Sequence, residues 1–328
     1  GRNIAETLTL KDFGSTDYFN LTINDTNTNK ATFASGAAKS IAGALTVSSG
    51  TYDANGNTTT VTGLTTVNGG TYLPSTATQT FNGGLTVSSG TFTGSSGAVD
   101  VNGNLALSGG TLTAPSGNLA ISGNFTVSGS PTFTHNSGTV TFDGAANQTF
   151  TTNGVTLNHL TLNNTGASGS DKLIISGNLD VNGTLTLTDG TLDLATNNPN
   201  VNTAGDVAIA SAGAVSKGTG TWTFDGSGTS TLTGNSQDLG TVTVDGSSKT
   251  VQLGGAVAFG ILTIGSDDTL SLAGNNVTVT TLSNNGTFKL QGNESVTITT
   301  MDTDSGTVEY TGRNIAETLT LKDFGSTD

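Results

Sequence analysis

The stretch LTVSSGTY at Leu45–Tyr52 is almost repeated forty residues later as LTVSSGTF at Leu85–Phe92. Within both copies apolar residues alternate with polar ones, which is the pattern of a strand with one buried face. The Ser-Ser-Gly between the apolar positions is typical of a corner. The repetition predicts that the chain returns to the same structural position after a fixed number of residues.

A period of twenty residues underlies this repetition. One glycine position recurs at Gly43, Gly63, Gly83, Gly103 and Gly123. Three further positions recur in step with it: Leu45, Thr65, Leu85, Leu105 and Phe125; Val47, Val67, Val87, Leu107 and Val127; Tyr52, Tyr72, Phe92 and Leu112. One turn alone cannot bury its apolar face, whereas stacked turns pair their backbones and bury continuous columns of side chains.

The columns predict an all-β fold, namely a right-handed three-faced β-solenoid (β-helix) with about 20 residues per turn. A globular sandwich would also have short strands, but it would not keep four columns in step over five turns. With strands about 4.8 Å apart, 311 residues give about 15 turns and a rod of roughly 70–75 Å. The prolines fit this fold because they lie beside turn-like residues, at Pro74, Pro115, Pro131 and Pro199.

The seventeen residues GRNIAETLTLKDFGSTD occur twice, at Gly1–Asp17 and Gly312–Asp328. We interpret residues 1–311 as one unit of a tandem array that forms a continuous β-solenoid, and residues 312–328 as the start of the next identical unit. The alternative is a duplicated segment used for overlap or exchange between separate subunits. Identity at every position favours recent copying of a whole unit.

A coarser similarity divides the unit into three modules that open near residues 142, 224 and 310. The opening segments are Val140–Gly144, Trp222–Gly226 and Val308–Gly312. Each is followed by a strand of the LTLN type, at Leu160–Asn163, Val242–Asp245 and, through the duplication, Leu21–Asn24. The third module therefore continues from the repeated segment.

The composition excludes several classes of function. Ten basic residues against 24 acidic ones give a formal net charge of -14, which makes binding to a phosphate backbone unfavourable, so no nucleic-acid partner is expected. Cysteine is absent, which removes disulfides and thiolate metal sites. No apolar run is long enough for a membrane span.

Several phrases resemble the repeats of bacterial extracellular β-strand-repeat proteins, including autotransporter-associated repeats and filamentous-haemagglutinin-like adhesins. They are SGGTLTA at Ser108–Ala114, GNFTV at Gly123–Val127 and GTLTLTDGTLDL at Gly183–Leu194. The resemblance implies a secreted or surface-attached right-handed β-solenoid that takes part in adhesion, fibres, sheaths or biofilm. The 311-residue duplication departs from typical passenger domains, whose turns drift in sequence.

Right-handed β-helices also include enzymes that cut acidic polysaccharides, and such sites need paired carboxylates in a groove. The candidate acidic residues are Asp267 and Asp268, and the group Asp302, Asp304 and Glu309. Capping of the turn backbone is the simpler role for the first pair, and Glu309 alternates with apolar neighbours and is expected to face solvent. We therefore predict no catalytic residue and no enzyme activity.

No cofactor or metal site is predicted, although weak Ca²⁺ binding at acidic turns stays open. His135 and His159 are isolated from any carboxylate cluster. Trp222 shares an apolar column with Val140 and Val308, so we expect it in the core and not on a sugar-binding surface.

Asparagine has two potential uses in this chain. At equivalent corners, as with Asn82 and Asn102, side-chain amides can hydrogen-bond along the stack. Glycosylation is permitted but not indicated by the Asn-x-Ser/Thr sequences, which begin at Asn20, Asn24, Asn57, Asn124, Asn147, Asn163, Asn182, Asn276, Asn285 and Asn293.

The sequence favours a structural protein, the repeat unit of a long extracellular fibre or cell-surface filament. Its expected partners are further copies joined head-to-tail along the rod axis, with lateral bundling or surface glycans as additional options. The first alternative is an adhesin stalk or passenger that binds glycan or a host surface. The second is a β-helical polysaccharide lyase or hydrolase.

Overall fold

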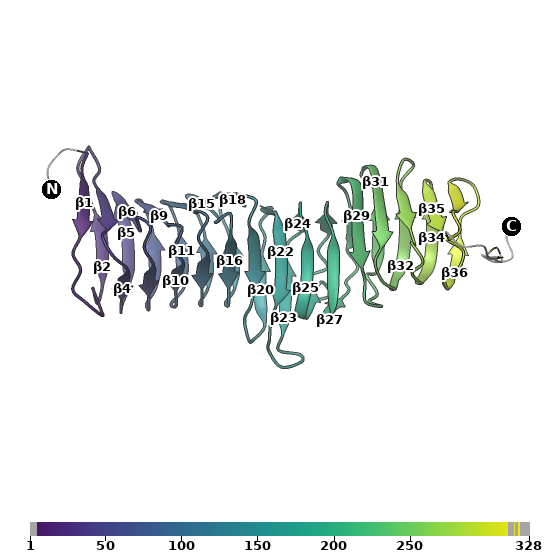
Figure 1. Cartoon of the computed structure of the whole chain (residues 1–328), viewed down its shortest axis with the longest axis horizontal. Coiled ribbons are helices and arrows are strands. Elements are labelled where there is room, and N and C mark those ends of the chain that lie inside the picture. Colours follow the sequence, from purple (N-terminus) through teal and green to yellow (C-terminus); the bar gives the residue numbers. More distant parts are fainter. Residues whose placement is uncertain (1–4, 314–317, 319–320, 322–328) are drawn as a thin grey trace. The chain divides into compact units, whose positions relative to one another are not determined.

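The computed structural model describes residues 5–313, 318 and 321. These residues form β-strands, turns and corners, and no helix occurs among them. The chain divides into two compact units, Gly1–Leu173 and Ile174–Asp328. In each unit the strands of successive turns lie side by side (Figure 1), and every strand pair whose register is given is parallel. The prediction of a β-solenoid is confirmed.

In unit 1 most turns contain three short strands, one on each of three faces. The first face holds β1 (Thr7–Leu10), β3 (Thr32–Ser35), β6 (Thr51–Asp53), β9 (Thr71–Leu73), β12 (Thr91–Thr93), β15 (Thr111–Thr113) and β18 (Thr132–Thr134). The second holds β4 (Lys39–Ile41), β7 (Thr59–Val61), β10 (Gln79–Phe81), β13 (Val99–Val101), β16 (Asn118–Ile121), β19 (Thr139–Phe142) and β22 (His159–Asn163). The third holds β2 (Leu21–Asn24), β5 (Leu45–Ser49), β8 (Thr65–Val67), β11 (Leu85–Val87), β14 (Leu105–Leu107), β17 (Phe125–Val127) and β20 (Gln148–Thr151). The two-residue β21 (Thr156–Leu157) follows, and β23 (Lys172–Ser176) passes from unit 1 into unit 2.

The columns predicted from the period of twenty are the core of unit 1. Leu45 pairs with Thr65, which pairs with Leu85, and the series continues to Phe125. Every side chain of the three columns is buried, with at most 1% exposed. In the third column the Tyr52 and Tyr72 rings stack at 4.9 Å, and the Phe92 ring lies 5.1 Å beyond. Alternation in sequence thus becomes a continuous apolar interior.

The glycine column is required by close contact between corners. A Cβ atom on Gly63 would lie 2.7 Å from the carbonyl carbon and oxygen of Gly43, a separation at which atoms overlap. The Gly63 N–H also donates to the Gly43 oxygen at 2.9 Å, and Gly123 bonds Gly103 in the same way at 3.1 Å. Each corner therefore rests directly on the backbone of the one before it.

Unit 2 builds its turns from fewer and longer strands. One set consists of β24 (Leu179–Val181), β26 (Val201–Thr203), β28 (Thr221–Phe224), β30 (Thr241–Val244), β32 (Val257–Ile264), β34 (Val277–Asn284) and β36 (Val296–Met301). The other consists of β25 (Leu185–Asp193), β27 (Val207–Ser216), β29 (Ser227–Thr233), β31 (Ser247–Leu253), β33 (Thr269–Ser271), β35 (Thr287–Leu290) and β37 (Thr307–Tyr310).

The merging of strands in unit 2 departs from the expectation of three separate short strands. β25 runs for nine residues and pairs with the ten residues of β27, with a register shift between Leu187 and Asp189. A shift of this kind bends a strand without ending it. The corner is therefore made by a bulge within a continuous ladder, at the turn-type residues Asp189 and Gly190.

Similar module openings lie in different sheets. The strand β19 pairs with β22, so that Val140 faces Leu160, and β28 pairs with β30, so that Trp222 faces Val242. These pairs belong to separate sheets, and β2, the third strand of the LTLN type, pairs with β5 on a further face of unit 1. The openings at β19 and β37 therefore belong to one sheet, and the opening at β28 belongs to another.

The duplicated segment is described mainly in its first copy, residues 1–17. From Ala5 onward this copy contains β1, which pairs with β3 over four residues from Thr7↔Thr32 to Leu10↔Ser35. The predicted opening of the next unit at residues 312–328 lies almost entirely outside the described residues.

Candidate functional site

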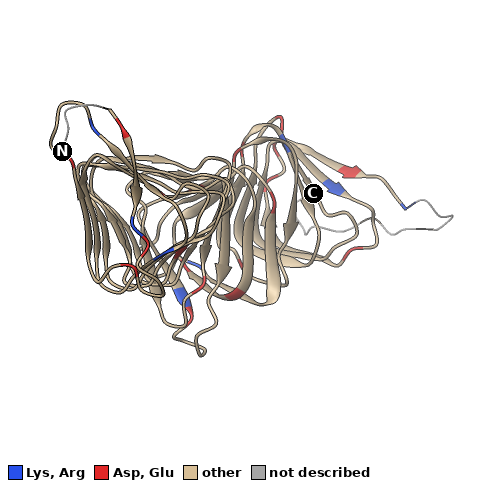
Figure 2. Cartoon of the chain, turned by 60° about the vertical axis from the view of Figure 1, so that its left-hand side comes forward, with Lys and Arg blue, Asp and Glu red and all other residues tan. Residues whose placement is uncertain are grey.

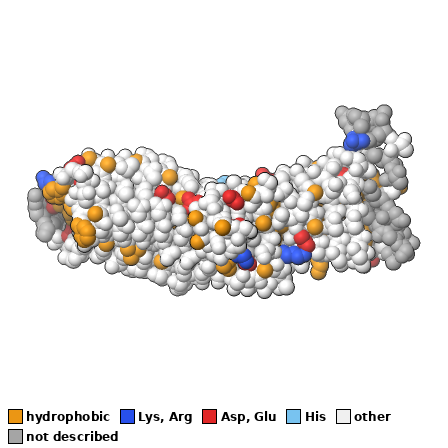
Figure 3. All heavy atoms as spheres, turned by 90° about the horizontal axis from the view of Figure 1, so that it is seen from below, with side chains coloured by type: hydrophobic (Ala, Val, Ile, Leu, Met, Phe, Trp, Pro, Cys, Tyr) orange, Lys and Arg blue, Asp and Glu red, His pale blue; other side chains and the backbone are white. Residues whose placement is uncertain are grey.

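The first turns of unit 1 form the site with the clearest construction. Side chains of β1, β2, β3 and the segment between β1 and β2 surround a groove of about 460 Å³. Its apolar lining includes Leu8, Phe13, Tyr18, Leu21, Ile23 and Phe33. Phe13 is 67% exposed, and Phe19, which follows Tyr18 in the sequence, is 74% exposed. Figure 3 shows hydrophobic side chains gathered at this end of unit 1. The groove offers an uncovered apolar surface beside a strand edge.

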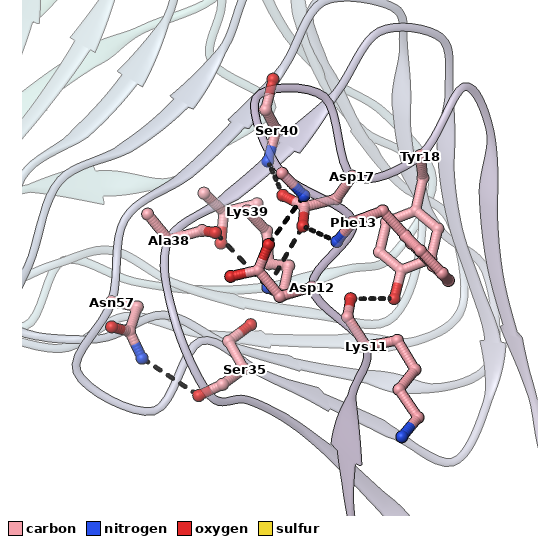
Figure 4. A network of polar contacts seen from close by, with 12 residues as sticks. Lys11, Asp12, Phe13, Asp17, Tyr18, Ser35, Ala38, Lys39, Ser40 and Asn57 are labelled. Carbon is pink, nitrogen blue, oxygen red and sulfur yellow. Dashed lines mark hydrogen bonds and ion pairs between the residues drawn. The ribbon is translucent and has the colours of Figure 1, made fainter.

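Asp17 attaches the segment after β1 to the following turn (Figure 4). Its carboxylate accepts the N–H of Ser40 at 2.8 Å and that of Phe13 at 3.2 Å. It also forms an ion pair with the Lys39 ammonium at 3.4 Å, and both side chains are almost fully buried. Burial alone would raise the pKa of Asp17, but the two N–H donors and Lys39 together hold that pKa below its ordinary value.

Tyr18 completes this end of the unit. Its hydroxyl donates to the Lys11 carbonyl oxygen at 2.7 Å, and its ring meets Phe13 edge-on at 5.5 Å. Burial raises the pKa of Tyr18, and the nearby carboxylates of Asp17 and Asp12 act in the same direction. The neutral phenol thus closes one side of the groove. The arrangement can bind an extended apolar segment through the apolar groove and the adjacent free edge of β1.

The acidic pair predicted from sequence is engaged with backbone. Asp268 is 2% exposed and accepts the N–H groups of Lys249 at 2.6 Å and Gly246 at 3.2 Å. Asp267 accepts the N–H of Ser248 at 3.0 Å. The two carboxylates therefore cap backbone N–H groups of the preceding turn, at residues 246–249. The capping predicted within one turn thus occurs between two successive turns.

The remaining acidic candidates have similar partners. Asp302 accepts the Ser283 hydroxyl and the Asn284 N–H at 2.9 and 3.0 Å, and Asp304 accepts the Ser305 hydroxyl at 3.4 Å. Glu309 is exposed on β37, as predicted, and forms an ion pair with Lys289 at 3.3 Å. Figure 2 shows acidic and basic residues distributed over many turns.

The other singled-out residues have structural positions. Trp222 is 1% exposed and its indole N–H donates to the Thr203 hydroxyl at 3.0 Å, which confirms the prediction of a core position. The Asn102 amide donates to Asn82 at 2.8 Å, as expected for a corner ladder. His135 accepts the Ser137 N–H at its Nδ1, and His159 lies partly exposed on β22.

Buried charge is the feature that the sequence analysis missed. Lys39, Lys249 and Glu294 are at most 2% exposed. A signal was present for the two lysines, because Lys39 and Lys249 each stand two residues before a buried aliphatic residue of the same strand, Ile41 or Val251. That spacing places them on the inner face.

Within the described part of the chain, no group of three or more His, Cys, Asp and Glu side chains is arranged to hold a metal ion. The same residues form no helix that is long and apolar enough to cross a membrane. No family model, curated protein or solved structure matches the chain.

Proposed function

We propose that this chain is a structural protein, the repeat unit of a long extracellular fibre or cell-surface filament in which copies follow one another head-to-tail. The observation that carries the proposal is the duplication of residues 1–17 at residues 312–328. Its first copy forms a stacked strand, β1, on the face that continues through β3. A repeated segment that belongs to the stack is what a serial solenoid requires.

The mechanical basis of the proposal is the bonding between turns. Parallel ladders join each turn to its neighbours, and side chains such as Asn82 and Asn102 add bonds in the same direction. The corners add further backbone contacts through stacked glycines. Such a stack resists local opening because a strand in its interior is bonded on both edges.

The placement outside the cell rests on the resemblance of Ser108–Ala114, Gly123–Val127 and Gly183–Leu194 to repeats of bacterial extracellular proteins. The net charge of -14 supports a filament that stays dispersed, because like charges oppose association. No catalytic residue or cofactor is assigned in this proposal.

The proposal is tested with chains that contain one, two and three 311-residue units, each ending in residues 312–328. Negative-stain electron microscopy measures the length of the particles. We expect the length to rise by an equal step with each added unit and the width to stay constant. Separate particles joined by variable gaps would show that the units do not stack, and the proposed function would then be wrong.

A further inference from the structure

The contacts of residues 6–17 with the next turn define an acceptor surface. Thr32 donates its N–H to the Glu6 carbonyl oxygen at 2.9 Å, and β1 then pairs with β3 over its whole length. At the other end of the segment, Asp17 binds Ser40 and Lys39. The acceptor surface therefore consists of β3 and the residues Lys39 and Ser40. It recognises a strand followed, seven residues later, by a carboxylate.

The second copy carries every group that the acceptor surface contacts in the first. Glu317, residues 318–321 and Asp328 are identical in sequence to Glu6, Thr7–Leu10 and Asp17. Identical sequences make identical contacts when they meet the same surface. A second molecule presents such a surface on its own β3.

We infer that residues 312–328 of one copy dock on the β3 edge of a second copy, in the register that β1 adopts, so that this segment is the joint between successive units. The inference rests on the proposed function and specifies its contact. Within one continuous chain the segment serves as the β1 of the following unit. Between separate chains, residues 312–328 of one chain displace residues 1–17 of the other chain from its β3.

The spacing of the chain supports this joint. β36 pairs with β34 so that Met301 faces Leu282, nineteen residues earlier (301 minus 282). Leu321, the equivalent of Leu10, comes twenty residues after Met301 (321 minus 301). The spacing from Leu282 to Met301 is thus continued by the spacing from Met301 to Leu321, and each is about one turn of the stack.

The same joint supplies a cover for the apolar groove. The inner side chains of β37, Val308 and Tyr310, are only partly buried, whereas the equivalent Val140 and Phe142 of β19 are at most 2% exposed. Because residues 312–328 follow β37 directly, docking on a second copy brings this uncovered turn toward the groove of that copy. Two incompletely covered apolar surfaces are then buried together.

Disulfide trapping in the full 328-residue chain tests the joint, because the chain contains no cysteine of its own. Thr7 and Thr32 are directly paired in the structure, and adjacent strands about 4.8 Å apart suit a disulfide. The positive control is therefore Thr7→Cys with Thr32→Cys, which forms a bond within one chain. The test is Thr318→Cys with Thr32→Cys, which we expect to link one chain to another and to give dimers and higher oligomers on a non-reducing gel.

Register is checked with Thr320→Cys and Thr32→Cys, in which the second cysteine is displaced by two residues. This pair lies on a diagonal of about 7–8 Å, so it should link at least about tenfold more slowly than the pair at Thr318. Equal rates would show a loose encounter of chain ends and would overturn the inferred register.

Reciprocal variants separate docking from general stability. Asp17→Ala weakens the first copy on the acceptor surface, so it should raise the fraction linked through Thr318→Cys by about fivefold or more. Asp328→Ala weakens the docking copy and should lower that fraction by a similar factor. Asp304→Ala, an exposed acid outside the segment, should leave it unchanged.

The inference is overturned if no link forms through Thr318→Cys in the Asp17→Ala background while the control pair at Thr7 forms normally. It is also overturned if Asp17→Ala and Asp328→Ala change linking in the same direction. Neither result would affect the equal length steps measured by microscopy for multi-unit chains, so the proposed function would stand with a different joint.

Discussion

Individual residues inside the stack carry polar groups that the apolar columns alone would not require. In the column of Leu45 and Leu85, the residue between these two is Thr65, whose buried hydroxyl has no hydrogen-bond partner. By contrast, the buried hydroxyls of Tyr52 and Tyr72 bond Thr59 and Gln79 at 2.8 and 2.7 Å. Burial of a polar group is costly only where its bonding is incomplete.

Thr65→Val should therefore stabilise the protein. The substitution keeps the shape of the side chain and removes the unsatisfied hydroxyl, so we expect the free energy of unfolding to rise by about 1–2 kcal/mol. Urea unfolding measures the change as a shift of the midpoint. The control is Thr66→Val, at an outward position of the same strand, which should change the midpoint little. A loss of stability in Thr65→Val would show that the hydroxyl has a partner in solution.

Glu294 predicts a pH dependence. It is 1% exposed, and its carboxylate accepts the N–H groups of Gln291, Gly292 and Gly274 at 2.7, 2.7 and 3.1 Å. Burial raises its pKa, but these donors outweigh burial and lower it overall. The carboxylate thus contributes stability above its unfolded-state pKa of about 4.5, and that contribution is lost as pH falls through the lower folded-state pKa.

Glu294→Gln should lower the free energy of unfolding by about 1–3 kcal/mol at pH 7. The difference from the unsubstituted protein should shrink as pH falls from about 4.5 through the lower folded-state pKa, because the glutamate is then protonated first in the unfolded state and afterwards in the folded state. The difference in the free energy of unfolding is measured by urea midpoints at several pH values, with Glu309→Gln, at an exposed position, as the control. A difference that stays constant down to pH 3 would contradict the role of the ionised carboxylate.

At the scale of elements, the corners restrict sequence as strongly as the strands. The Gly63 corner packs against the Gly43 corner. The strands that follow these two corners, β5 and β8, pair in register. Gly255 offers a contrast, since the nearest atom to a Cβ there would be 3.6 Å away. Close contact therefore excludes a larger residue at Gly63 but not at Gly255.

Gly63→Ala should destabilise unit 1 by about 1–3 kcal/mol, because its methyl group overlaps the Gly43 peptide and forces the corners apart. Gly255→Ala should be nearly neutral or slightly stabilising. Urea unfolding of the two variants under the same conditions compares them. Equal losses at both sites would indicate that the glycines act through backbone freedom and not through contact.

The elements also show what sequence can predict. The columns through Leu45, Val47 and Tyr52 follow from a strict period, because stacking repeats one environment at every turn. Alternation distinguishes inward from outward positions, but it does not say on which face a strand lies, so the similar openings at Val140 and Trp222 fell on different sheets. The groove and the Asp17–Lys39 pair depend on contacts between turns 22 residues apart, which no local pattern contains.

The whole molecule is modular in steps of one turn. Leu85 pairs with Leu105, and the residues after each follow equivalent paths, so Ala106 takes the place of Thr86. Stability in such stacks is approximately a sum of turns and of the contacts between neighbours. The number of turns should therefore be adjustable, whereas a fraction of a turn should not be.

Deletion of residues 86–105 should leave a folded protein, because Leu85 is then joined to Ala106 with all columns in register. Deletion of residues 86–95 removes half a turn and should abolish cooperative unfolding of the affected region. Circular dichroism during urea titration distinguishes the outcomes. Similar behaviour of the two deletions would argue against turns as the units of stability.

The stacking of Leu45, Thr65 and Leu85 in one column also has a consequence for heredity. The segments Leu45–Tyr52 and Leu85–Phe92 are nearly identical in amino-acid sequence and lie two turns apart, so an unequal recombination between their coding stretches would add or remove forty residues in frame. Each such product would contain whole turns only. Alleles of different length could therefore arise in a single event, and selection could act on the number of turns without first repairing the fold.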